Sequence, residues 1–235
     1  MGIASVLAVL GAGLSMGLGA IGSAVGEGLI AMNAVDALGR QPRASAKILR
    51  IMIVSQAVTE TAAIFALVVS LLLMFQAGGD SLFKGITYLA AGFAMGAGAI
   101  GAGFGAGLPG SAAMTGIGKQ PKNSDVLTIN MIIGQAVTQT STIFALTVSL
   151  ILYMAAPEEG VVRMAACLGA GLAMGFGAVG PGIGDGIVAR FANIGVSRNP
   201  ENMGLLTRSM IIGQAITETT DIYAMVVSLI LIFVI

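Results

Sequence analysis

Five acidic residues lie in stretches of the sequence that are otherwise apolar, and these residues could carry chemistry. They are Glu27, Glu60, Asp185, Glu218 and Asp221. A central carboxylate costs roughly 2.5–3.5 kcal/mol to insert into a membrane, so it is kept only where a positive charge neutralises it. No Lys or Arg lies at the same depth of these stretches. We therefore expect a proton, a metal cation or an arginine of another protein to supply the charge. The remaining acids are set aside because they fall in or beside polar loops: Asp36, Asp80, Asp125, Glu158, Glu159 and Glu201.

Four of the five acids belong to two sets of equivalent positions. The sets are Glu60, Gln139 and Glu218, and Glu27, Ala106 and Asp185. Glutamine is polar and similar in shape to glutamate, but it can neither release a proton nor balance a cation. Both acids are missing from the same third of the chain, which predicts that the two positions act as a pair. Because two touching carboxyls cannot both ionise at low cost, one of them is expected to hold a proton and hydrogen-bond to the other.

Hydroxyl and amide side chains surround the key position in each third. Thr59, Thr138 and Thr217 directly precede it, Thr61, Thr140 and Thr219 directly follow it, and Ser141 and Thr220 come next. Such an oxygen-rich set suits a hard monovalent cation such as Na⁺, by analogy with oxygen-ligated metal sites. The alternative is that each hydroxyl bonds only to a backbone carbonyl of its own helix. Gln56, Gln135 and Gln214 are predicted to hydrogen-bond across helices, with an ion-ligand role as their alternative.

The elements that position these residues repeat three times with a period of 79 residues. Gln56, Gln135 and Gln214 stand 79 apart, as do Pro42, Pro121 and Pro200. Each repeat has an apolar segment, a polar middle with a helix breaker, and a second apolar segment, which is the pattern of a helical hairpin. The predicted hairpins are 1–79, 80–158, in which Gln139 replaces the carboxylate, and 159–235.

The predicted fold is an all-α membrane protein with six transmembrane helices. Their expected ranges are 3–38, 45–76, 82–117, 124–155, 161–196 and 205–235. Each is longer than the roughly 20 residues that cross a bilayer. Apolar residues make up 56% of the chain and charged residues only 9%, whereas roughly a quarter of the residues of a soluble domain are charged. We see no cleavable signal and expect the first segment to remain as a membrane span.

Charge and composition restrict location and partners further. The basic residues cluster in the polar middles, so the positive-inside rule places the three hairpin loops in the cytoplasm and both termini on the opposite side. The formal net charge is zero, and no basic field invites nucleic acid. The single Cys167 and the lack of histidine remove an internal disulfide and the usual zinc and iron–sulfur ligand sets. No tightly bound cofactor is expected.

The first helix of each hairpin is rich in glycine. Gly17, Gly19 and Gly22 fit a dinucleotide-binding fingerprint, which recurs in both later repeats. That fingerprint requires a preceding strand and a turn, whereas these glycines lie within long apolar segments. They are interpreted as close-packing positions that let helix backbones approach, and in a ring they would form the crowded inner wall.

The combination of a glycine-rich helix, an Arg40-Gln41-Pro42 loop and the outer-helix segment QAVTET beginning at Gln56 resembles the proteolipid subunit of rotary ATP synthases. That proteolipid is called c in F-type enzymes and c or K in V/A-type enzymes. The resemblance covers the whole chain. It implies a homo-oligomeric rotor ring, in the membrane of a prokaryotic cell, that carries Na⁺ or H⁺ past an arginine of the stator. The nucleotide chemistry would belong to other subunits, so the chain itself is not an enzyme.

The resemblance also assigns residues. For the third hairpin, it implies Glu218 as the ion-carrying carboxylate, Asp185 and Thr219 as side-chain ligands, the Ile216 carbonyl as a backbone ligand, Thr220 as a water holder and Tyr223 as a lock on Glu218. For the first hairpin it implies Glu60, Glu27, Thr61 and the Val58 carbonyl, with Ala62 and Phe65 in place of the water holder and the lock. A site would span adjacent hairpins, so Thr140 and the Val137 carbonyl are expected to serve a neighbour. Asp221 has no assigned role. The implied contacts to central-stalk subunits are Arg40, Gln41, Pro42, Lys119, Gln120 and Pro121.

Three alternatives stay open. Several hairpins in one chain and a lost carboxylate are typical of the V/A-type branch, whereas the loop and the outer-helix segment are typical of the F-type. A cation-coupled secondary transporter also uses buried acids and repeats, but its usual repeats are inverted, whereas these are parallel. A purely structural membrane oligomer would explain the glycines but not the acids.

Overall fold

The computed structural model describes residues 2–76, 80–157 and 159–235. The hairpin boundaries predicted after residues 79 and 158, and the loop acid Glu158, lie outside these residues. In the described part of the chain the regular structure is helical: α1 (Ile3–Arg40), α2 (Ser45–Met74), α3 (Leu82–Lys119), α4 (Ser124–Thr138), α5 (Thr140–Met154), α6 (Val161–Gly177), α7 (Val179–Arg198) and α8 (Met203–Phe233). Six helical spans there are long and apolar enough to cross a membrane. The predicted fold class is confirmed.

Each helical hairpin turns at a proline. Short 3₁₀ turns cover Pro42–Ala44, Pro121–Asn123 and Pro200–Asn202, with the proline at the first position in each. Proline is favoured there because an N–H at this position would have no acceptor within the helix, so its loss costs nothing. The φ angle of proline is also already helical. We name the hairpins one (α1 and α2), two (α3, α4 and α5) and three (α6, α7 and α8).

Two of the six predicted helices are interrupted, which the sequence prediction did not anticipate. The second helix of hairpin two breaks at Gln139, where ψ opens to −10°, and the first helix of hairpin three breaks at Ala178, where ψ is −19°. Pro181 explains the second break, because its ring clashes with the carbonyl of Gly177 four residues earlier. At the first break, the Thr140 hydroxyl oxygen lies 2.6 Å from the Val137 carbonyl oxygen.

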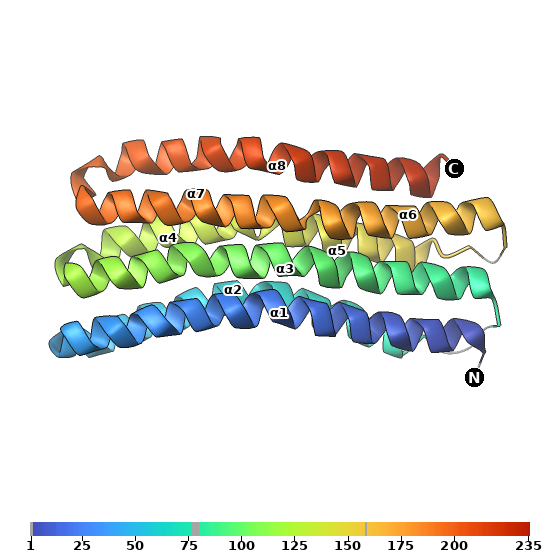
Figure 1. Cartoon of the computed structure of the whole chain (residues 1–235), viewed down its shortest axis with the longest axis horizontal. Helices are drawn as coiled ribbons and strands as arrows, with labels where there is room; N and C mark the ends of the chain where they lie inside the picture. Colours follow the sequence, from blue (N-terminus) through green and yellow to red (C-terminus); the bar gives the residue numbers. More distant parts are fainter. Residues whose placement is uncertain (1, 77–79, 158) are drawn as a thin grey trace.

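The helices form two layers that run along the long axis of the molecule (Figure 1). The glycine-rich layer contains α1, α3 and the α6–α7 pair, and the second layer contains α2, the α4–α5 pair and α8. Both termini lie at one end of the molecule, and the three proline turns lie at the other (Figure 1). Equivalent residues of successive hairpins therefore stand side by side at the same height.

Backbones touch within the glycine-rich layer. A Cβ added to Gly92 of α3 would collide with the backbone of Gly11 in α1, and a Cβ added to Gly105 would collide with the backbone of Gly182 in α7. Close contact of this kind gives van der Waals attraction in a medium that lacks a hydrophobic driving force between helices. Gly17, Gly19 and Gly22 lie inside α1. The predicted packing role is confirmed for Gly19 and Gly22, whereas Gly17 has open space where a Cβ would stand.

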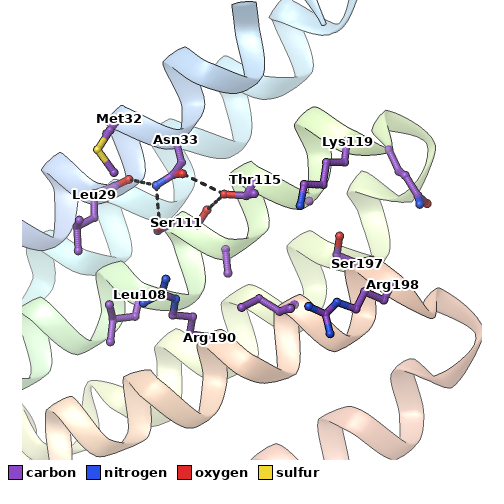
Figure 2. Close-up of a pocket in the computed structure, with 14 residues that line it drawn as sticks. Leu29, Met32, Asn33, Leu108, Ser111, Thr115, Lys119, Arg190, Ser197 and Arg198 are labelled. Atoms are coloured by element: carbon purple, nitrogen blue, oxygen red, sulfur yellow. Dashed lines mark hydrogen bonds between the residues drawn. The ribbon is translucent and has the colours of Figure 1, made fainter. Parts of the chain in front are cut away.

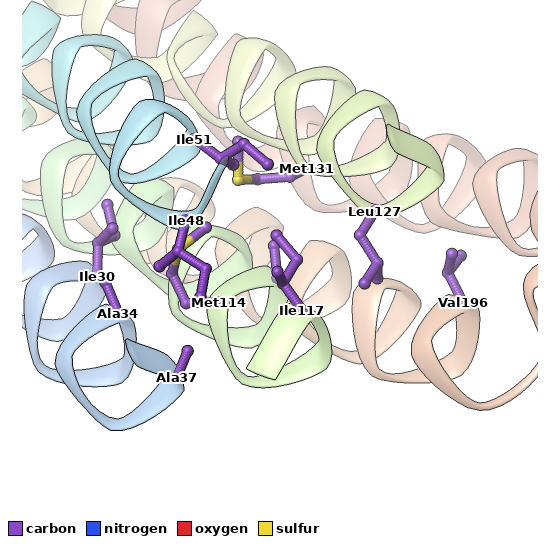
Figure 3. Packing of buried hydrophobic residues seen from close by; sticks show 11 residues of the cluster. Ile30, Ala34, Ala37, Ile48, Ile51, Met114, Ile117, Leu127, Met131 and Val196 are labelled. Atoms are coloured by element: carbon purple, nitrogen blue, oxygen red, sulfur yellow. The ribbon is translucent and has the colours of Figure 1, made fainter. Parts of the chain in front are cut away.

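An apolar core joins the two layers near the proline turns, and polar contacts connect neighbouring helices within the glycine-rich layer. A hydrogen-bonded group connects α1 to α3: Asn33 Nδ2 donates to Ser111 Oγ at 2.8 Å, and Thr115 Oγ1 donates to Asn33 Oδ1 at 3.0 Å (Figure 2). Behind it, Ile30, Ile48 and Met114 pack together from α1, α2 and α3, in a cluster that extends to Val196 of α7 (Figure 3). This core holds helices of all three hairpins together near the proline turns.

Candidate functional site

The two glutamates of the second layer lie at the centres of their helices. Glu60 stands 15 residues after the first residue of α2 and 14 before the last. Glu218 stands 15 residues from both ends of α8. Each therefore lies near mid-membrane, where a carboxylate needs a compensating positive particle. We call the contact between hairpins one and two the first junction and the contact between hairpins two and three the second junction.

The second junction brings together a carboxylate and the hydroxyl of a neighbour. Thr140 of α5 donates its hydroxyl hydrogen to Glu218 Oε1 of α8. The same hydroxyl lies 2.6 Å from the Val137 carbonyl oxygen. Glu218 is partly exposed, so its carboxylate remains accessible from the membrane side. A carboxylate, a hydroxyl and a carbonyl at one point offer the oxygen ligands that a hard cation prefers.

The first junction has the same layout but is closed by an amide. Gln139 Nε2 donates to the Val58 carbonyl oxygen at 2.8 Å and lies 3.4 Å from the Thr59 carbonyl oxygen. Thr142 Oγ1 lies 3.3 Å from Gln139 Oε1 on the other side. Gln139 is only 6% exposed. Its N–H groups thus occupy the place that a cation or proton would take between two oxygens.

Glu60 lies on a free edge, not at a junction. It is exposed, and Glu27 of α1 is partly exposed beside it. The groups that stand one repeat from Thr140 and Val137 are Thr219 and Ile216 of α8, on the opposite edge of the molecule. Ile216 is 67% exposed. One chain therefore presents a carboxylate on one edge and the matching hydroxyl and carbonyl on the other.

Two further acids are fully enclosed near the second junction. Asp185 of α7 and Asp221 of α8 are each 0% exposed, and neither carboxylate has a hydrogen-bond partner among the described residues. Ser141 of α5 lies beside Asp221, and Thr217 lies beside Asp185. The described residues include no group of three or more acids placed to hold one metal ion. A carboxyl enclosed in this way either holds a proton or needs a compensating positive charge, and the sequence repeat had assigned no role to Asp221.

The glutamines one turn before the key position hold the helices in register. Gln135 Nε2 donates to the Ala106 carbonyl at 2.9 Å within its hairpin and lies 3.1 Å from the Ser55 carbonyl of hairpin one. Gln214 Nε2 repeats the pattern one repeat later, with the Asp185 carbonyl at 3.2 Å and the Gly134 carbonyl at 3.1 Å. The predicted cross-helix hydrogen bonds are confirmed.

Most of the predicted hydroxyl ligands bond within their own helices. Thr61 donates to the Ala57 carbonyl at 3.4 Å, Thr219 to the Ile216 carbonyl at 2.7 Å, and Thr220 to the Thr217 carbonyl at 3.1 Å. The backbone-bonding alternative therefore describes these three hydroxyls in the single chain. Tyr223 is 65% exposed, and no hydrogen bond joins it to Glu218 among the described residues.

The loop residues lie together at the proline-turn end. Arg40 forms an ion pair with Asp36 at 2.9 Å, with both side chains more than half exposed. Gln41 and Pro42 follow it, and Lys119, Gln120 and Pro121 hold the equivalent places in hairpin two. Their exposure leaves them accessible to a partner.

Comparison with known proteins gives matches along all three hairpins. A family model that describes the C subunit of ATP synthase matches residues 10–73, 89–152 and 168–231. The chain is 47% identical over 75 residues to the ATP synthase c subunit of Petrotoga mobilis, a match that covers 32% of this chain and 78% of the relative. It is 39% identical over 77 residues to the same protein of Thermotoga petrophila, covering 33% and 91% of the two chains. It is 49% identical over 74 residues to that of Dehalococcoides mccartyi, covering 32% and 97%.

Proposed function

Because the chain belongs to the family of ATP synthase c subunits, we propose that it forms part of a rotor ring that couples the movement of a cation across the membrane to ATP synthesis or hydrolysis. The family's members are ion-carrying membrane subunits, and the nucleotide chemistry takes place on other subunits. This chain is accordingly an integral, multi-pass membrane protein and not a catalytic subunit. Its particular form has three hairpins where each relative has the length of one.

The observation that carries the proposal is the position of Glu60 and Glu218. Both stand at the centres of membrane-spanning helices, and neither forms an ion pair with a described residue. Each acid would hold its cation while it faces lipid. It would release the cation when rotation brings it to an arginine of the stator, because that fixed positive charge replaces the mobile one.

Copies of the chain would close into a ring by repeating the internal junctions. Gly92 and Gly96 of α3 are pressed against α1, whereas their equivalents Gly13 and Gly17 of α1 have open space where a Cβ would stand. Gly180 of α7 is open in the same way on the other edge. A surface that fits a different surface of an identical chain forms a head-to-tail contact, which closes into a ring when the rotation permits.

The proposed ion sites follow from this closure. The second junction would use Glu218, with Thr140 and the Val137 carbonyl opposite it and Asp185 nearby. The site between chains would use Glu60 and Glu27 of one chain with Thr219 and the Ile216 carbonyl of the next. Thr61, Thr220, Tyr223 and the Val58 carbonyl remain proposed members of these sites. The transported ion is Na⁺ or H⁺, and the experiment below separates the two.

The closed first junction would give the ring a low ion count. Hairpins one and three carry a carboxylate at the key position, whereas hairpin two carries Gln139. Each charge that crosses 100 mV supplies roughly 2.3 kcal/mol, so fewer carriers supply less work per turn for synthesis and require less work per turn for pumping. We propose a ring suited to building steep ion gradients. A measured ion-to-ATP ratio equal to that of one carrier per hairpin would contradict this.

The proline turns and the termini are assigned to opposite sides of the membrane. The proline turns would face the cytoplasm, where Arg40, Gln41 and Pro42, with Lys119, Gln120 and Pro121, would contact the central stalk. Both termini would lie on the opposite side.

Carbodiimide labelling of the purified complex tests the proposed carriers directly. This reagent modifies protonated carboxyl groups within membranes, so we expect modification of Glu60, Glu218 or both, located by mass spectrometry of peptides. If Na⁺ is the coupling ion, added Na⁺ slows the reaction at constant pH. If H⁺ is the coupling ion, Na⁺ has no effect. No modification at either residue would contradict the proposed role of both.

A further inference from the structure

A cavity of about 450 Å³ near the proline turns has no part in the proposed ion path (Figure 2). Its walls come from α1, α3 and α7, all of which belong to the glycine-rich layer. Leu29 and Met32 contribute from α1, Leu108 and Thr115 from α3, and Arg190 and Arg198 from α7. A volume of this size is within the usual range of ligand-binding pockets, about 300–1,000 Å³.

The cavity concentrates positive charge without a matching negative one. Lys119, Arg190 and Arg198 all line it, and the described lining residues include no Asp or Glu. None of the three cationic side chains forms an ion pair with a described residue. The surroundings therefore favour an anion that comes from outside the chain.

Arg190 makes this charge particular to hairpin three. Its equivalents are Met32 and Ser111, which also line the cavity but are uncharged. Arg190 precedes the helix end at Arg198 by eight residues, which places it about 12 Å further from the proline turns. A guanidinium at that depth is costly unless it reaches a polar phase or finds an anion.

The polar groups opposite the arginines are already satisfied by one another. Asn33 donates to Ser111 at 2.8 Å and to the Leu29 carbonyl at 2.9 Å, and Thr115 donates to Asn33 (Figure 2). The guanidinium N–H groups of Arg190 and Arg198, with the Lys119 ammonium, are thus donors left for a ligand. Their planar fork matches the oxygens of a phosphate group.

Apolar surface adjoins the charged part of the cavity. Leu29, Met32, Leu108 and Ile194 line the cavity itself. A second cavity of about 140 Å³, lined by apolar side chains that include Phe93, lies on the same layer between α1, α3 and α6. A ligand suited to this surface has an anionic head and a hydrocarbon tail, whereas a free phosphate ion would make no use of the apolar part.

We propose that the cavity binds the headgroup phosphate of one anionic phospholipid per chain, with Arg190 as its principal ligand and Arg198 and Lys119 beside it. Basic pockets between transmembrane helices are a known means of holding anionic lipid headgroups. The bound lipid would fill the concavity between hairpins and offset the charge that Arg190 carries into the membrane-spanning part of α7. This inference depends on membrane insertion but not on which residues carry the transported ion.

Lipid binding to the intact ring tests the proposal. The ring, purified in a mild non-ionic detergent, is titrated with phosphatidylglycerol and with phosphatidylcholine of the same chain length, and bound lipid is counted by native mass spectrometry. We expect phosphatidylglycerol to saturate at one per chain, at a concentration about tenfold or more below that of phosphatidylcholine, given about 1 kcal/mol per basic residue. Equal binding of the two lipids would overturn the proposal.

Variants locate the site within the ring. Arg190→Met copies the residue of hairpin one and is expected to abolish the preference for phosphatidylglycerol. Arg208→Met removes an exposed arginine of α8 that lies near the same height on the other layer, and it is expected to leave the preference unchanged. Should Arg190→Met fail to assemble, Arg190→Lys keeps the charge without the fork and is expected to weaken the preference severalfold. A preference that survives in an assembled Arg190 variant would contradict the assignment.

Two further measurements test whether free phosphate or a protein partner occupies the cavity instead of a lipid. Excess inorganic phosphate is expected to leave the lipid bound, and complete displacement would make the cavity a free-phosphate site instead. Binding of the central stalk to the Arg190→Met ring is expected to be normal. Loss of stalk binding with unchanged lipid binding would assign the cavity to a protein partner and overturn the proposal.

Discussion

At the key position, the two junctions within the chain differ by the amide nitrogen of Gln139 in place of a carboxylate oxygen. At the first junction, Gln139 Nε2 carries hydrogen toward the Val58 carbonyl oxygen. At the second junction, a carboxylate oxygen of Glu218 occupies the equivalent position and accepts from Thr140. The N–H of the Gln139 amide therefore supplies the partial positive charge that faces the carbonyl oxygen. A carboxylate has no such hydrogen, so a mobile ion would have to supply the positive charge. On the proposed function, the first junction needs no ion for this reason, whereas the second does.

Restoring the acid at the first junction should open it. In Gln139→Glu, a carboxylate would face the Val58 and Thr59 carbonyls and would need a cation or proton between them. We expect a third carbodiimide-reactive residue per chain and an ion-to-ATP ratio about 1.5 times that of the wild type, because the carriers rise from two to three. Gln139→Ala is the control, which removes the amide without adding a carrier. A third reactive residue without any rise in the ratio would contradict the carrier count.

The hydroxyl that faces Glu218 should set the affinity of the second junction. Thr140→Val removes one hydrogen bond to a carboxylate, a loss of about 1.5 kcal/mol or more, which corresponds to at least about tenfold in affinity. The concentration of coupling ion that protects Glu218 from carbodiimide should rise by that factor, with Glu60 unaffected. Thr219→Val in the assembled ring should show the reverse selectivity. If each substitution changed the protection of Glu60 and Glu218 equally, the assignment of Thr140 to Glu218 and of Thr219 to Glu60 would be wrong.

The sequence singled out the intramembrane acids, and the resemblance implied that Thr140 serves a neighbouring hairpin, but the partners of Gln139 within the chain were not predicted. Equivalence between repeats identified Glu60, Gln139 and Glu218 without a structure. The contacts of Gln139 with Val58 and of Thr140 with Glu218 depend on the rotation of neighbouring helices, which periodicity alone does not determine. Asp221 was found as a buried acid, but its neighbour Ser141 became apparent only from the packing.

At the scale of helices, number and approximate bounds were predictable, whereas interruptions were not. The lengths of the apolar segments and the positions of the three prolines in the polar middles determine six membrane-spanning helices. The break at Ala178 had a signal in Pro181, four residues after Gly177, which the prediction of one continuous helix overlooked. The prediction that basic residues cluster in the polar middles also did not reveal that Arg190 lies on α7, about 12 Å before its last residue.

Glycine positions inside the chain and on its free edge should respond differently to a larger side chain. Gly105 is pressed against Gly182 of α7, and Gly17 faces open space. Gly105→Val should lower the unfolding free energy of the chain by about 3 kcal/mol, at the upper end of overpacking costs, measured by unfolding in detergent. Gly17→Val should leave this free energy nearly unchanged and prevent ring assembly, measured by the fraction of assembled ring on native gels.

A neutral control makes this comparison decisive. Gly204, at the start of α8, also faces open space, but it lies outside the glycine-rich layer. Gly204→Ala should alter neither stability nor assembly. A fully assembled Gly17→Val ring would show that this edge is not the contact between copies.

At the scale of the whole molecule, three hairpins in one chain allow their sites to differ. Separate one-hairpin proteins in a homo-oligomeric ring would all carry the same residue at the key position. Here one closed junction, one open junction and one site shared between chains alternate in a fixed order. Fusion also allows one hairpin to carry Arg190 while the other two carry Met32 and Ser111, which gives one lipid site for every three hairpins.

The central claim is that mid-membrane carboxylates carry the ion, and replacing both of them at once tests it most directly. In the complete enzyme complex, Glu60→Gln combined with Glu218→Gln should abolish ion flow coupled to nucleotide turnover while the ring still assembles. The loop variant Glu201→Gln, as the control, should retain full coupling. If the double variant still couples ATP turnover to cation movement, the account is wrong.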